Sequence, residues 1–123
     1  MGGQISSQQR AANGEVISVN SLDHWNTQLK SSITSNKLMV IDFSADWCGP
    51  CKIIEPAVHD FAVEFSNVEF IKIDVDELPD VAKDYSVQAM PTFLLLKKGE
   101  EVGRVVGAKK DELRRMIEKH RYI

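Results

Sequence analysis

A pair of closely spaced cysteines stands at the boundary between two different sequence patterns. The motif Trp-Cys-Gly-Pro-Cys-Lys at residues 47–52 follows the apolar run 38–43 and precedes a segment with helical periodicity. A Cys-x-x-Cys motif at a strand-to-helix junction in an α/β pattern is typical of a dithiol redox site. The chain must therefore fold so that a buried strand delivers both thiols to the first turn of a helix.

The spacing of the two cysteines suits a disulfide that opens and closes. Residues three positions apart share one face of a helix, with Cβ atoms roughly 5–6 Å apart, which is close enough for a disulfide after a modest adjustment. Pro50 is tolerated in a first turn, so the helix should begin between Cys48 and Pro50. The positive end of that helix favours a thiolate and lowers the pKa of Cys48 below its reference of about 8.5. This predicts Cys48 as the nucleophile and Cys51 as the resolving thiol.

Composition argues against several classes of protein. The chain has 123 residues, of which 43% are hydrophobic, as expected for one domain with a core. Its net charge of -3 gives no basic surface for nucleic acid. Both cysteines belong to the motif, so no structural disulfide framework exists and a reducing, cytoplasmic setting is favoured. No apolar run is long enough for a membrane span, and no secretory signal is recognised, so we do not expect export.

The first 14 residues differ in composition from the rest of the chain. Residues 1–14 are rich in Gly, Ser, Gln and Asn, and we interpret them as a flexible extension of a domain at 15–123. Met1-Gly2 followed by Ser6 fits the N-myristoylation pattern, in which Gly2 is acylated; an unmodified tail is the alternative. One acyl chain gives weak, reversible membrane contact, and Arg10 is the lone basic residue nearby, so a second membrane signal is missing.

The remaining pattern alternates strands and helices. Strands are predicted at 16–19, 38–43, 68–75, 93–96 and 102–106, and helices at 22–33, 48–65, 79–85 and 109–120. Ser21 should cap the first helix and Pro56 should kink the second. The turn at 98–100 makes the last two strands an antiparallel hairpin. The predicted fold class is therefore α/β, a mixed five-stranded central sheet flanked by four helices.

Several further motifs accompany the cysteine pair. They are Asp42 six residues before the first cysteine, Pro56, Met90-Pro91-Thr92 and Gly107-Ala108. With these motifs the chain resembles thioredoxins from Val16 to its C-terminus. The segments 42–45 and 74–77 are most similar to cytosolic eukaryotic forms, and the extension with Gly2 is similar to that of some plant h-type thioredoxins. The resemblance implies the thioredoxin fold, and we expect a monomer.

The resemblance also implies roles for individual residues. Pro91 would be a cis-proline beside the disulfide, and the backbone of Met90 would pair with an extended segment of the substrate. Trp47 would flank the cysteines and contact the substrate, and Lys72 falls where the family places a lysine near its buried aspartate. The residues implied to shape the site are thus Trp47, Gly49, Pro50, Lys72 and Pro91.

These observations lead to a mechanistic hypothesis. The Cys48 thiolate attacks a disulfide of a target protein, and Cys51 then attacks Cys48 and releases the reduced target. Asp42 is the candidate base for Cys51, because desolvation in an apolar strand raises the pKa of its carboxyl. The alternative for Asp42 is a hydrogen-bonded structural acid. Gly49-Pro50 resembles the reducing members of the family, so we expect reduction of targets.

The cysteine pair is also compatible with other functions. A zinc site usually needs four ligands, and His24, His59 and His120 have no finger-like spacing to the pair, so we expect no metal. A static disulfide and a non-enzymatic docking module are further alternatives. No cofactor is expected to be bound. The resemblance implies electrons from NADPH through a thioredoxin reductase, or from glutathione and glutaredoxin.

Overall fold

A five-stranded mixed sheet forms the centre of the fold in the computed structural model, which describes residues 14–122. The strands are β1 (Val16–Val19), β2 (Leu38–Ser44), β3 (Glu69–Asp74), β4 (Thr92–Lys97) and β5 (Glu100–Val106). Their order in the sheet is β1-β3-β2-β4-β5, with β3 parallel to β1 and β2, and β4 antiparallel to β2 and β5. This confirms the predicted mixed sheet, with β2 at its centre.

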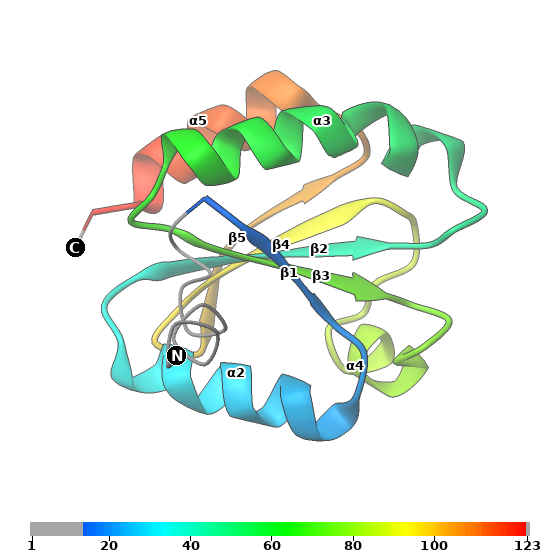
Figure 1. The fold of residues 1–123 in the computed structure, drawn as a ribbon, viewed down its shortest axis with the longest axis horizontal. Helices are drawn as coiled ribbons and strands as arrows, with labels where there is room; N and C mark the ends of the chain where they lie inside the picture. Colours follow the sequence, from blue (N-terminus) through cyan, green and yellow to red (C-terminus); the bar gives the residue numbers. More distant parts are fainter. Residues whose placement is uncertain (1–13, 123) are drawn as a thin grey trace, which may run out of the picture.

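Helices cover both faces of this sheet. They are α2 (Leu22–Thr34), α3 (Gly49–Glu64), α4 (Pro79–Asp84) and α5 (Lys110–His120). In Figure 1, α3 and α5 lie on one face, and α2 and α4 lie on the other. Right-handed crossovers between parallel strands place helices on the faces of a sheet in this way. Within residues 14–122, each helix falls short of the length and apolar content that crossing a bilayer requires.

The alternation of side chains along β2 divides the core into two clusters. Leu38 and Val40 pack toward α3 and α5, whereas Met39, Ile41 and Phe43 pack toward α2 and α4. Every residue of β2 is buried. Because side chains alternate along a strand, Asp42 follows Val40 onto the face covered by α3. An acidic group is thereby placed in a strand that is otherwise almost wholly apolar.

Several local predictions agree with the structure and others need correction. The Ser21 side chain accepts a hydrogen bond from the backbone N–H of His24 at 3.1 Å, as a helix cap does. The helix predicted from residue 22 has two half-exposed apolar residues, Leu22 and Ile33. Pro56 lies inside α3, which runs from Gly49 to Glu64, and the kink expected at this proline stays a prediction.

The hairpin between β4 and β5 is tighter than predicted. β5 begins at Glu100, two residues before the expected start, so the loop is limited to Lys98 and Gly99. Both residues have positive φ, 53° and 85°. A two-residue loop with this pair of φ values matches the twist of the flanking strands, and Gly99 adopts it at low cost.

Candidate active site

The two cysteines lie at the start of α3, immediately after the loop that leaves β2. Cys48 is the N-cap residue of α3, and Gly49 and Pro50 form the first helical positions, as predicted. The two cysteines form a disulfide with a Cα–Cα distance of 5.3 Å. The backbone N–H of Cys51 donates to Sγ of Cys48 at 3.1 Å. When the pair is reduced, this amide and the helix N-terminus stabilise negative charge on Cys48.

The disulfide is nearly covered by its neighbours. Cys48 and Cys51 are 4% and 6% exposed, and they pack with Ala45, Val75 and Met90. The carbonyl oxygen of Met90 lies 3.5 Å from Sγ of Cys48, a distance at which a reduced thiol can donate to it. The sulfur of Cys48 therefore lies beside a surface formed by these neighbours.

Two residues implied by the resemblance flank this surface. The Met90–Pro91 peptide bond is cis, as the resemblance implied, and Pro91 is buried. Trp47 is 66% exposed, and its indole Nε1 donates to Oδ2 of Asp76 at 2.8 Å. This hydrogen bond fixes the exposed ring beside the cysteines. The apolar ring of Trp47 and the backbone of Met90 thus lie next to Sγ of Cys48.

Asp42 lies beneath α3 in the centre of the sheet. It is 6% exposed and stands opposite Lys72 of β3 and Phe93 of β4 in the strand registers. Its buried Oδ1 atom has no hydrogen-bonding partner among the described residues. Burial raises the pKa of Asp42 from 3.8 to about 7, Lys72 opposes this rise and Glu55 adds to it. A carboxyl with this pKa exchanges protons near neutral pH.

Lys72 forms an ion pair with a residue other than Asp42. Its Nζ donates to Oε2 of Glu55 at 2.9 Å. This hydrogen bond is the main cause that raises the pKa of Lys72 and lowers the pKa of Glu55. Cys51, Glu55 and Lys72 together line a small cavity of about 110 Å³. Cys51 and the Glu55–Lys72 ion pair thus share one cavity.

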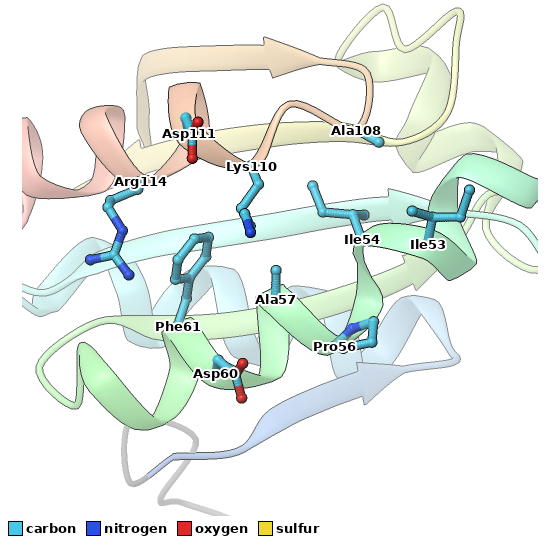
Figure 2. A pocket seen from close by; sticks show the side chains of 10 residues that line it. All are labelled: Ile53, Ile54, Pro56, Ala57, Asp60, Phe61, Ala108, Lys110, Asp111 and Arg114. Carbon is cyan, nitrogen blue, oxygen red and sulfur yellow. The ribbon is translucent and has the colours of Figure 1, made fainter.

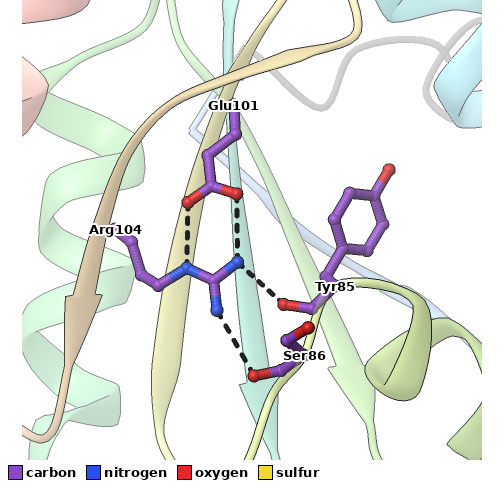
Figure 3. Close-up of polar contacts among 4 residues, drawn as sticks. All are labelled: Tyr85, Ser86, Glu101 and Arg104. Atoms are coloured by element: carbon purple, nitrogen blue, oxygen red, sulfur yellow. Dashed lines mark hydrogen bonds and ion pairs between the residues drawn. The ribbon is translucent and has the colours of Figure 1, made fainter.

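An arginine of β5 holds the loop that leads to Met90. The Arg104 guanidinium pairs with Glu101 through two hydrogen bonds, 2.9 Å from Nε and 3.0 Å from Nη2. Figure 3 shows that the same group also reaches the carbonyl oxygens of Tyr85 and Ser86, at 2.7 Å and 3.5 Å. Ser86 has a positive φ of 56°. Arg104 therefore anchors the chain where α4 ends and the loop toward Met90 and Pro91 begins.

A larger groove lies away from the cysteines. It has a volume of about 560 Å³ and runs between α3 and α5, with Ile54 and Phe61 on one side and Lys110 and Arg114 on the other (Figure 2). Neither cysteine lines it. The groove is therefore separate from the dithiol. Among residues 14–122 no cluster of three or more His, Cys, Asp and Glu side chains is suited to a metal ion.

Sequence reasoning missed three contributors to this site. Glu55 lies one turn after Cys51, a spacing that places both on one helix face and could have drawn attention to it. Asp76 and Arg104 act across the fold, and no local pattern indicates their partners. Gly2, the predicted acylation site, lies outside the described residues.

Comparisons with known proteins agree with this geometry. A family model described as Thioredoxin matches residues 16–119. Thioredoxin H2 of Arabidopsis thaliana is 54% identical over 106 residues, covering 86% of this chain and 80% of that protein. Thioredoxin H-type 2 of Nicotiana tabacum is 52% identical over 110 residues, covering 89% of this chain and 93% of that protein. The crystal structure of thioredoxin NaTrxh from Nicotiana alata is 57% identical, with a TM-score of 0.85, covering 86% of this chain and 92% of the other.

Proposed function

The chain belongs to the thioredoxin family and is a thiol-disulfide oxidoreductase with a redox-active disulfide, and from this premise we propose the role of each side chain. The family acts on disulfide-containing target proteins and depends on reductase partners. The observation that carries the proposal is the position of Cys48 at the N-cap of α3, with the Cys51 amide directed at its sulfur. In this position Cys48 is the thiolate nucleophile.

The reaction transfers two electrons to the target. The Cys48 thiolate attacks one sulfur of the target disulfide, the target S–S bond breaks, and the second target sulfur leaves as a thiolate. Cys51 then loses its proton and attacks Sγ of Cys48. This second attack forms the Cys48–Cys51 disulfide and releases the first target sulfur as a thiolate. The target is reduced and the dithiol is oxidised, so a donor must reduce the pair before the next turnover.

Asp42 serves as the base for Cys51. Its carboxyl is buried on the sheet face beneath α3, the helix that carries Cys51, and its Oδ1 atom has no hydrogen-bonding partner within residues 14–122. With a pKa of about 7, the carboxylate accepts a proton at neutral pH and returns it readily. Replacing Asp42 by Asn should slow the resolution of the mixed disulfide and remove its dependence on pH near 7. An unchanged rate and pH profile would refute the assignment.

Substrate binding uses the surface around Cys48. An extended target segment pairs with the backbone of Met90 and contacts the exposed ring of Trp47. The support for this role is the 3.5 Å approach of the Met90 carbonyl to Sγ of Cys48 and the exposure of Trp47. Pro91 follows Met90 and, with Gly49 and Pro50, shapes the site around the disulfide.

Turnover of a protein disulfide tests the proposal. With NADPH and a thioredoxin reductase, the protein should reduce the disulfides of insulin, and Cys48→Ser should abolish this activity. Activity with dithiothreitol but none with the reductase would point to a different electron donor, such as glutathione with glutaredoxin. Inactivity with both reductants would contradict the proposed reaction, and a Cys48→Ser, Cys51→Ser double variant that keeps its biological activity would favour a docking module.

The N-terminal segment has a separate proposed role. We assign residues 15–123 to the catalytic domain, place the protein in the cytoplasm, and propose that acylation of Gly2 adds weak, reversible contact with membranes. The motif at Gly2 supports this proposal. Mass spectrometry of the native N-terminus should find a myristoyl group, and an unmodified Gly2 would remove membrane contact from the proposal. Deletion of residues 2–14 should leave turnover of insulin unchanged.

A further inference from the structure

The lysine that stands opposite Asp42 in the sheet pairs with a different carboxylate. Lys72 stands opposite Asp42 on the neighbouring strand, and because the two strands are in register both side chains lie on the sheet face covered by α3. The ammonium of Lys72 nevertheless binds Oε2 of Glu55 at 2.9 Å. Oδ1 of Asp42 is buried and has no hydrogen-bonding partner among the described residues. Glu55 thus competes with Asp42 for the same cation.

We propose that Glu55 is a positioning residue, which holds the Lys72 ammonium at α3 and so leaves the Asp42 carboxyl without an ion-pair partner. Glu55 belongs to the turn of α3 that follows Cys51, and both residues line the cavity that Lys72 also lines. The ion pair is therefore located on the wall of the cavity beside the resolving cysteine. The catalytic consequence of this arrangement rests on the proposed role of Asp42 as the base.

The charges around Asp42 give the direction of the effect. Lys72 is contributed by β3, and Glu55 by α3; β4 contributes Phe93, which carries no charge. The thiol of Cys51, when reduced, is a further titratable group on α3. More distant charges act on the two members of the ion pair. Asp46 helps to raise the pKa of Lys72, and His59 and Lys52 help to lower the pKa of Glu55. Loss of Glu55 removes a negative charge and also frees Lys72 to bind the carboxylate of Asp42.

Both consequences lower the pKa of Asp42. Glu55 raises the pKa of the Asp42 carboxyl and Lys72 lowers it. An opposite charge that moves within about 4–6 Å of a carboxylate lowers its pKa by about 1–3. A base with a lower pKa holds the Cys51 proton less strongly, so the pH range over which Asp42 is active should move downward.

The test is a titration of the Asp42 carboxyl in Glu55→Gln by carbon-13 NMR. The oxidised protein is used, because the cysteines of a disulfide do not titrate. The midpoint of Asp42 should move to lower pH by about one unit. Glu64→Gln is the matched control: Glu64 is also on α3 and is also ion-paired, but with Arg114 of α5, so its loss should leave the midpoint unchanged. An unchanged midpoint in Glu55→Gln would overturn the proposal.

A second pair of variants tests whether Glu55 acts through Lys72. In a Lys72→Gln background, Glu55→Gln should shift the Asp42 midpoint by less than half of its shift in the native background, because the competing cation is absent. Equal shifts in the two backgrounds would show that Glu55 acts by its own charge, and would contradict the positioning role. Because Glu55 is partly exposed, Glu55→Gln should fold. Glu55→Ala repeats the test with a side chain that cannot accept a hydrogen bond from Lys72.

The experiment also separates this inference from the proposed base. If Glu55→Gln shifts the Asp42 titration while Asp42→Asn leaves the pH profile of mixed-disulfide resolution unchanged, the base assignment fails and the positioning role stands. If Asp42→Asn removes the pH dependence while Glu55→Gln moves neither the titration nor that profile, the positioning role fails and the base assignment stands.

Discussion

The buried carboxyl of Asp42 should make the oxidised protein less stable as pH rises. Its pKa is 3.8 in an unfolded reference and about 7 in the folded chain. Between these values the folded state binds more protons than the unfolded state, so stability falls with rising pH and levels off above pH 7. The full cost at pH 9 is about 4 kcal/mol, and less than half of it is already present at pH 5. Asp42→Asn, which cannot ionise, should therefore gain about 3 kcal/mol over the native chain between pH 5 and pH 9.

Urea unfolding of both oxidised proteins at several pH values measures this gain. The difference in unfolding free energy between variant and native chain should grow between pH 5 and pH 7.5 and then become constant. Taking this difference cancels the titration of other groups, which both chains share. Asp60→Asn on the exposed side of α3 is the control, and it should change stability by less than about 0.5 kcal/mol. A difference that stays constant with pH would refute the raised pKa.

Other contacts lead to further predictions. Arg104→Met removes the anchor of the loop before Met90, so the KM for a protein disulfide should rise several-fold with little change in kcat; an unchanged KM would contradict the anchoring role. Arg115→Met on the exposed face of α5 is its control. In the hairpin, Gly99→Ala should lower the unfolding free energy by about 1–2 kcal/mol, because φ is 85° there. Lys98→Asn should raise the unfolding free energy by about 0.5–1 kcal/mol, because asparagine tolerates this turn conformation. Thermal unfolding measures both changes. An unfolding free energy that Gly99→Ala leaves unaltered would contradict the turn argument.

Local signals were sufficient to predict the position of the dithiol. The apolar run before Cys48 indicates a buried strand, and Pro50 is compatible with the first turn of a helix but not with its interior. These two signals place the helix start within one residue of its observed position. The same alternation of patterns predicted the order of strands and helices, since each element carries its own periodicity.

Contacts between distant segments could not be predicted in the same way. Lys72 was assigned near Asp42 by resemblance, but its hydrogen bond to Glu55 joins residues 17 positions apart on different elements. The bonds of Arg104 to the carbonyls that end α4 likewise depend on how β5 passes that loop. Helical spacing also does not indicate how completely a helix is covered by the rest of the fold. Leu22 and Ile33 follow the helical spacing of buried residues, but each is about half exposed.

The most direct test of the account traps the mixed disulfide. Cys51→Ser removes the resolving thiol, so incubation of its reduced form with a disulfide-bonded target should accumulate a covalent adduct through Cys48. Cys48→Ser should form little adduct, because Cys51 lies within the first turn of α3 and not at the N-cap, where the backbone amide of Cys51 stabilises a thiolate on Cys48. Mass spectrometry of the two mixtures identifies the attached cysteine. Adduct formation through Cys51 at an equal or greater rate would contradict the assignment of Cys48 as the nucleophile.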